Sequence, residues 1–289
     1  MNDYNRLARQ AMRQALMLRK AQHISPNRPV QIYDLVDALG LELRFLDVPS
    51  MEGLYYRSNP AAIVISSLRP NGRRAYTCAH ELGHHVFGHG NRIDELTNRQ
   101  PGPTTFNAEE YVADQFASAM LMPKAAVDWA FHIRGWDPAG ATPEQIYTIA
   151  GWLGVGYETL VYHLGLSLRL FGRTHMVRLL RVSPKRIRAS SMGFEAEQDL
   201  LIADIHWQDR SIDIEAGDLV ALPASVSVEG SCTEIVREDS DKTLVRGASP
   251  GCGRVAIRGG VWSADIRVAR HGYVGRNMFR HLEESISGE

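Results

Sequence analysis

The sequence is poor in cysteine and has almost no net charge. Three cysteines among 289 residues, Cys78, Cys232 and Cys252, are too few for a disulfide-stapled fold and are typical of a chain in a reducing compartment. A formal net charge of −1 excludes a whole-chain field that would attract nucleic acid or an anionic membrane. Any such binding would therefore need a local patch.

Long apolar runs are also missing. No stretch approaches the roughly 20 apolar residues that span a bilayer. Residues 1–22 carry charges throughout, lack the apolar core of a signal peptide, and predict an amphipathic helix. These features favour a soluble, cytoplasmic protein with no membrane partner.

Periodicity and turn residues predict an α+β chain in three parts. Residues 1–125 are expected to form a helical and small-sheet domain, 126–172 a helical segment, and 173–289 a separate β-rich domain. The first domain should contain a loop rich in Pro, Thr and Asn over about 91–107. Its predicted helices cover about 4–22, 31–40, 73–89 and 108–122, and its predicted strands cover 41–48, 53–58 and 61–67.

The segment AHELGHHVFGHG, residues 79–90, holds four histidines and one glutamate. Successive helical side chains turn by about 100°, which places His84 about 40° and Glu81 about 100° from His80. His80 and His84 can therefore bind a single ion, with Glu81 beside them.

The same helical geometry places two further histidines away from that face. His85 falls at about 140° and His89 at about 180°, so both are expected to be surface or packing residues. Cys78, at about 160°, is expected to pack as a small apolar residue.

HELGH is the H-E-x-x-H pattern of zinc metallopeptidases, in which two imidazoles hold the metal and the glutamate acts as general base. With eleven histidines in the chain, the odds of a chance match are on the order of a few per cent. The pattern alone is therefore not sufficient, because a catalytic zinc site also needs a third protein ligand.

The segment EEYVAD, on the next predicted helix, offers candidates for this third ligand. Glu110 and Asp114 are spaced i, i+4 and can both face the first helix. Glu110 would bind the metal, and Asp114 would orient a ligand histidine. Glu109 points about 100° away and is the weaker candidate. Alternatively, Glu110 closes a capping box with Asn107.

RRAYTCAHELGHHVFGH followed by EEYVADQFASAMLMP resembles the ImmA/IrrE-type metallopeptidases of bacteria and their mobile elements. The likeness covers about 1–165 and implies a zincin-like metallopeptidase fold. It implies His80, His84 and Glu110 as zinc ligands and Glu81 as catalytic base. It also implies a helix-turn-helix (XRE-type) repressor as substrate, whose cleavage derepresses stress-response or mobile-element genes.

Two features of the sequence bear on how a substrate would bind, namely the predicted strands and a few tyrosine and histidine side chains. Strand 61–67, or 53–58 before it, is expected to offer an edge to which an extended peptide adds. Tyr76, Tyr111 or a distant histidine are candidates to stabilise the oxyanion, although a buried, hydrogen-bonded tyrosine is the simpler interpretation of each.

Residues 143–166 have the spacing of a helix-turn-helix, with a turn at 154–156. The second helix, YETLVYHL, has no Lys or Arg for DNA, so packing or partner docking is favoured over DNA binding. The basic run 173–188 is expected to be a solvated linker. Cys232 and Cys252 lack the C-x-x-C spacing of a metal ribbon.

The sequence therefore predicts a metalloendopeptidase with a β-rich regulatory or sensor domain, using zinc or, in its place, manganese or iron. One alternative is a non-proteolytic regulator that binds and sequesters a repressor. The other is a DNA-binding transcription regulator using 143–188.

Overall fold

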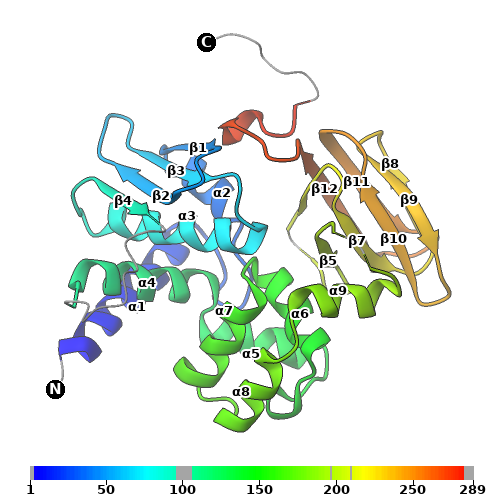
Figure 1. Cartoon of the computed structure of the whole chain (residues 1–289), viewed down its shortest axis with the longest axis horizontal. Coiled ribbons are helices and arrows are strands. Elements are labelled where there is room, and N and C mark those ends of the chain that lie inside the picture. Colours follow the sequence, from blue (N-terminus) through cyan, green and yellow to red (C-terminus); the bar gives the residue numbers. More distant parts are fainter. Residues whose placement is uncertain (1–2, 96–105, 196, 209, 283–289) are drawn as a thin grey trace. The chain divides into compact units, whose positions relative to one another are not determined.

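The computed structural model describes residues 3–95, 106–195, 197–208 and 210–282 (Figure 1). Its contacts divide into two units. Unit 1 comprises Met1–His132, Leu153–Gly156 and Val274–Asn277, and unit 2 comprises Ile133–Trp152, Tyr157–Tyr273 and Met278–Glu289. The prediction of a mixed α+β chain, with a helical region followed by a β-rich one, is confirmed.

Unit 1 is built on a five-stranded sheet in the order β13-β1-β3-β2-β4. β1 and β3 are parallel, and β2 runs antiparallel to both β3 and β4. β-branched and aromatic side chains such as Ile63, Ile65 and Phe45 are almost fully buried, as strand propensity leads one to expect. The strands are β1 (Glu42–Leu46), β2 (Met51–Tyr56), β3 (Ala62–Ser66), β4 (Arg92–Glu95) and β13 (Gly275–Arg276).

β4 corrects two expectations from the sequence. Part of the loop predicted over 91–107 is a strand at Arg92–Glu95, while 96–105 lie outside the described residues. β4 pairs with β2, and β3 lies between β1 and β2. The prediction that β2 or β3 offers a free edge is therefore wrong. The sequence RIDE is short and polar, and a strand there is defined only by its pairing with β2.

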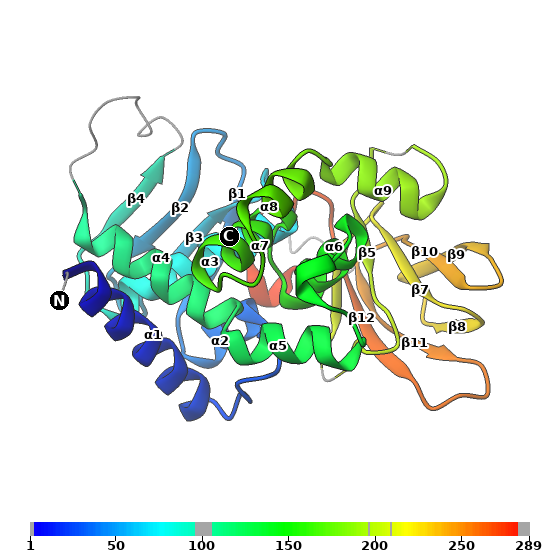
Figure 2. The same ribbon diagram turned by 90° about the horizontal axis from the view of Figure 1, so that it is seen from below.

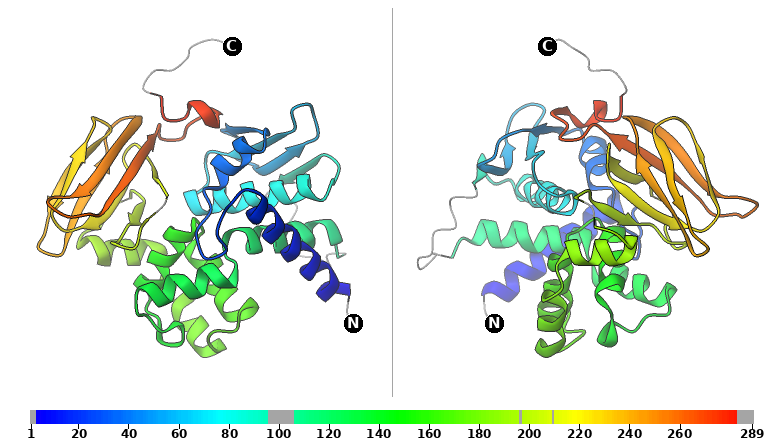
Figure 3. Two further views of the ribbon diagram at one scale, coloured as in Figure 1. Left: turned by 180° about the vertical axis from the view of Figure 1, so that it is seen from behind. Right: turned by 45° about the vertical axis from the view of Figure 1, so that its right-hand side comes forward.

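The other edge of the sheet is covered by a segment from far along the chain. β13 pairs antiparallel with β1 through Arg44–Arg276 and Phe45–Gly275 (Figure 3). The amide of Asn277 donates to the Asp37 carboxylate of α2 over 2.7 Å. Residues close to the C-terminus thus complete a sheet that begins at β1.

Helices cover this sheet in layers, with α3 between the sheet and α4, and α1 packed on α4 (Figure 2). α1 buries Ala11 and Ala15, whose small side chains permit a close approach to α4. The helices of this part are α1 (Asp3–Ala21), α2 (Ile32–Ala38), α3 (Asn71–Val86), α4 (Ala108–Leu121) and α5 (Lys124–Ile133), each close to its predicted range where one was predicted.

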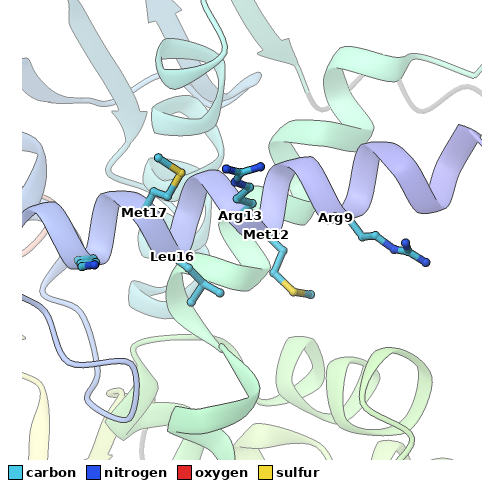
Figure 4. A pocket seen from close by; sticks show the side chains of 6 residues that line it. Arg9, Met12, Arg13, Leu16 and Met17 are labelled. Atoms are coloured by element: carbon cyan, nitrogen blue, oxygen red, sulfur yellow. The ribbon is translucent and has the colours of Figure 1, made fainter.

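The opposite face of α1 is exposed. Met12 and Met17 are each about half exposed, and basic side chains flank them along the helix (Figure 4). The stripe consists of Arg9, Met12, Arg13, Leu16, Met17 and Lys20. α1 is thus amphipathic as predicted, but its small residues face the core and several of its larger apolar residues lie outside.

Arg19 is the exception on the inner face of α1, with an exposed fraction of 1%. Its guanidinium donates to the backbone carbonyls of Met120, Ser25 and Arg28. Burial lowers the pKa of Arg19 to about 10. These bonds join the C-terminal end of α1 to α4 and to the loop that follows α1.

Helices precede the strands in unit 2. α6 (Pro143–Leu153) and α7 (Tyr157–Tyr162) are separated by three residues, in line with the predicted pair of helices. Where a linker was predicted over 173–188, the chain forms α8 (Arg173–Leu180) and α9 (Pro184–Met192) instead. Buried Met176, Leu179 and Ile187 recur among the arginines and anchor these helices.

Two four-stranded sheets complete unit 2, in the orders β5-β7-β10-β9 and β6-β12-β11-β8. Met192 at the end of α9 packs with Leu200, Leu219 and Leu244 of the first sheet. The strands are β5 (Leu200–Ile202), β6 (Ile212–Glu215), β7 (Leu219–Pro223), β8 (Val226–Glu229), β9 (Thr233–Glu238), β10 (Lys242–Gly247), β11 (Gly251–Ile257) and β12 (Ser263–Ala269). Among the described residues, no helix is long and apolar enough to cross a membrane.

Replacing Arg19 by methionine should destabilise unit 1 by about 3 kcal/mol, because three backbone carbonyls, including that of the buried Met120, lose their donor. Urea unfolding of Arg19→Met measures the change. Lys20→Met, at the exposed neighbouring position, is the matched control. Equal stability of the two variants would contradict a structural role for the buried guanidinium.

Candidate metal centre

α3 carries the H-E-x-x-H segment through the interior of unit 1. The helix is buried along most of its length because the sheet lies on one side and α4 on the other. His80 is 6% exposed, and Glu81 and His84 are fully buried. Buried ionisable groups of this kind are stable only when they have partners, so their surroundings are informative.

Small residues allow α4 to approach α3 closely. A Cβ at Gly83 would lie 3.1 Å from Ala113 Cα and 3.2 Å from the Phe116 ring, which is tighter than ordinary contact. Ala113 is itself fully buried. The two helices therefore meet at Gly83, between His80 and His84 in the sequence, and this contact brings the first turn of α4 to the histidines.

The side chains of His80, His84 and Glu110 converge on one point. His80 Nε2 lies 3.0 Å from His84 Nε2 and 3.2 Å from Glu110 Oε2, and His84 Nε2 lies 3.6 Å from Glu110 Oε1. Two ligands of a tetrahedral zinc ion are about 3.4 Å apart when each bond is about 2.1 Å. The donor spacing of this cluster therefore fits a single small cation, and the cluster is consistent with a metal ion.

Asp114, one turn beyond Glu110, lies behind His80. Its Oδ1 is 3.0 Å from His80 Nδ1, the ring nitrogen that faces away from His84. Burial lowers the pKa of His80, but hydrogen bonds to Asp114 and Glu110 and the nearby charges of Asp114 and Glu81 together raise it to about 10. The environment of His80 thus favours positive charge, as a cation site requires.

Glu110 sits in the first turn of α4. The side chain of Asn107 caps this helix by accepting from the backbone NH groups of Glu109 and Glu110 over 3.0 and 3.5 Å. The Glu110 carboxylate faces the histidines, and a hydrogen bond from His80, together with the nearby His84 ring, holds its pKa well below the usual range. Asn107 therefore caps the helix, whereas the Glu110 carboxylate points to His80 and His84 instead of closing a capping box.

Glu81 lies against the neighbouring strand. A Cβ at Gly53 of β2 would fall 2.4 Å from Glu81 Oε1 and 2.5 Å from the Thr77 methyl. Only glycine at position 53 leaves room for the carboxylate in this place. Gly53 could not be singled out from the sequence, since the pairing that brings β2 over α3 is non-local.

The two histidines predicted to face away behave differently. His85 Nδ1 lies 3.1 Å from the hydroxyl of Tyr55 on β2, which agrees with a packing role. His89 does not face away, because its Nδ1 lies 2.8 Å from His84 Nδ1. The angle of 180° predicted for His89 assumed a helix as far as residue 89, and α3 ends at Val86. That His89 is a packing residue and not a ligand stays a prediction.

Both tyrosines considered for the oxyanion have partners elsewhere. The hydroxyl of Tyr76 lies 3.3 Å from the Asp114 carbonyl and 3.2 Å from Ser118 Oγ, and burial raises its pKa to about 12. The Tyr111 ring lies 5.5 Å from that of Tyr4, edge to face. The Tyr76 contacts support the simpler interpretation, in which a hydrogen-bonded ring packs between α3 and α4, while for Tyr111 the oxyanion question stays open.

Residues 36–164 match the sequence model of the peptidase M78 family, described as the IrrE N-terminal-like domain. This match supports the ImmA/IrrE-type family for this segment. It spans α3 and α4 with the whole histidine and glutamate cluster, and covers just under half of the chain. The IrrE-like domain therefore suggests a metallopeptidase-like protein, and the resemblance read from the two motifs is confirmed.

Other comparisons add little. No curated protein matches the sequence. Among solved structures, a Mycobacterium tuberculosis transcriptional regulator matches with a TM-score of 0.33 and 16% identity, over 56% of this chain. The aligned part is only 46% of that regulator. A score this low does not establish a common fold.

Removing the Tyr76 hydroxyl tests whether it is structural. Tyr76→Phe should lower the free energy of unfolding by about 1 kcal/mol, the usual net value of a hydrogen bond, and should leave metal binding unchanged. Thermal unfolding and metal titration of the variant provide both numbers. A large loss of metal affinity without loss of stability would show that the hydroxyl acts on the cluster instead.

Proposed function

We propose that the chain is a zinc-dependent endopeptidase that cleaves a helix-turn-helix transcriptional repressor. The observation that carries the proposal is the convergence of His80, His84 and Glu110, with Glu81 beside them, inside an IrrE-like domain. Two imidazoles and one carboxylate are a common set for catalytic zinc, and they leave one position for water or substrate. Manganese or iron would fit the same donors less selectively.

In this proposal each side chain has a distinct role. His80, His84 and Glu110 hold the ion, and Asp114 fixes the His80 ring by accepting from its Nδ1. When bound, zinc supplies the Lewis acidity that polarises the scissile carbonyl.

Glu81 performs the proton transfers. Its carboxylate takes a proton from the attacking water and later passes it to the leaving amine nitrogen. The position suits a general base, since Glu81 is fully buried and Gly53 leaves room for its carboxylate. A structural metal site needs no such group, so Glu81 favours catalysis over a purely structural role.

The repressor substrate rests on the family resemblance. Cleavage of such a repressor would derepress stress-response or mobile-element genes, so the protein would control their transcription. In this proposal the β-rich part of unit 2 serves as the regulatory or sensor domain.

The proposal is tested by incubating the protein, with zinc or manganese, with the helix-turn-helix repressor encoded nearest to its gene. Wild type should produce a discrete cut. Glu81→Gln keeps the three donors but lacks the base, so it should bind zinc and cut at least about 1,000-fold more slowly. Electrophoresis and mass spectrometry of the fragments measure the rate and the cleavage site.

Two other outcomes would each reject part of the proposal. If wild type and Glu81→Gln both bind the repressor and neither cuts it, the protein sequesters its target and is not a peptidase. If salt-sensitive binding to duplex DNA appears without cleavage, it is a DNA-binding regulator.

Gly53→Ala probes the placement of Glu81 from the opposite strand. The added methyl group would overlap the Glu81 carboxylate, so the base should be displaced while the metal donors on α3 and α4 stay in place. We expect at least a tenfold loss of cleavage with one equivalent of zinc still bound, measured by metal analysis and kinetics. Full activity of Gly53→Ala would show that the base does not need this position.

A further inference from the structure

The chain reverses sharply where α3 ends. Gly88 has a φ of +68°, in the left-handed region, and its NH donates to the His85 carbonyl over 3.0 Å. The NH of His89 donates to the His84 carbonyl, also over 3.0 Å. These two bonds and the left-handed glycine form a Schellman motif, with His89 at its last position and His84 three residues before the helix cap.

A Schellman motif brings those two side chains together. In this motif the residue after the glycine donates its NH to a carbonyl in the last helical turn. Its side chain usually makes an apolar contact with the residue that carries this carbonyl. Here both are histidines, and the contact is polar, with 2.8 Å between their Nδ1 atoms. The His89 ring also stacks on Phe87, with 5.9 Å between ring centroids.

We propose that His89 is a positioning residue for the metal centre, which holds His84 in the tautomer that can bind the ion. This inference deepens the proposed function and depends on it only in that a metal binds at His84. His89 itself lies on the far side of His84 from His80 and Glu110, so it is not proposed as a ligand.

The direction of the hydrogen bond follows from the ring chemistry. His84 Nε2 faces His80 and Glu110, so the lone pair needed for a metal must be on that nitrogen. A neutral imidazole then carries its proton on Nδ1, which donates to Nδ1 of His89. The opposite arrangement, with His89 donating, would leave the proton of His84 on Nε2 and block the metal.

The two ligand histidines are thereby supported in different ways. His80 donates to a carboxylate, Asp114, whereas His84 donates to a neutral ring. His84 is fully buried, and an additional charge beside it would need its own partners, whereas an imidazole acceptor adds none. Residues that orient ligand histidines in this manner commonly contribute 10- to 100-fold to metal affinity.

Two substitutions separate the hydrogen bond from ring packing. His89→Phe keeps a ring that can stack on Phe87 but has no acceptor. His89→Asn loses the ring but places an amide oxygen near the former Nδ1. His85→Phe is the matched control, because His85 is also near the end of α3 and contacts Tyr55 rather than His84.

Zinc dissociation constants are measured by competition with a chromophoric chelator, and thermal unfolding of the metal-free proteins checks the fold. We expect His89→Phe to bind zinc about 10- to 100-fold more weakly than wild type. His89→Asn and His85→Phe should stay close to wild type. Gly88→Ala, which disfavours the left-handed turn, should weaken zinc binding in the same direction as His89→Phe.

The position of the proton on His84 gives a second readout, by ¹⁵N NMR of the imidazole rings. We expect Nδ1 of His84 to be protonated in metal-free wild type, and the preference to be lost in His89→Phe. Wild-type zinc affinity in His89→Phe, or an equal loss in His89→Asn, would overturn the inference. A wild type that binds zinc but cuts nothing would reject the proposed peptidase alone.

Discussion

The arrangement of the candidate centre depends on the close approach of α3 and α4. Gly83, inside the HELGH segment, faces Ala113 across this contact, and a Cβ on Gly83 would crowd both Ala113 and Phe116. Without that approach the carboxylate of Glu110 would not reach the two histidines of α3. One glycine and one alanine thus set the separation of two helices, and this separation sets the spacing of the three donors.

The cluster of His80, His84 and Glu110 was accessible from the sequence because helix geometry determines each half of it locally. Spacings of four residues place His80 with His84, and Glu110 with Asp114, each pair on one face. Only the pairing of the two helices had to be assumed. The support for Glu81 was not accessible in this way, since Gly53 lies 28 positions before it and reaches it only through the fold of β2 over α3.

The remaining errors share a cause, which is that local patterns do not report where an element ends or what it pairs with. The position predicted for His89 assumed that the helix continues past Val86. The helix ends there, and the left-handed turn at Gly88 places His89 next to His84. β4 is too short and polar, and β13 too short, to be recognised before their partners are known. Charge density suggested a linker at α8 and α9, where spaced apolar residues hold helices instead.

The position of Glu110 gives the cluster two halves of unequal local stability. His80 and His84 belong to the interior of a long buried helix, whereas Glu110 is in the first turn of α4, held by the Asn107 cap. Helix ends open at a lower free energy than helix interiors. An ion bound by all three donors would couple the order of that first turn to its own occupancy.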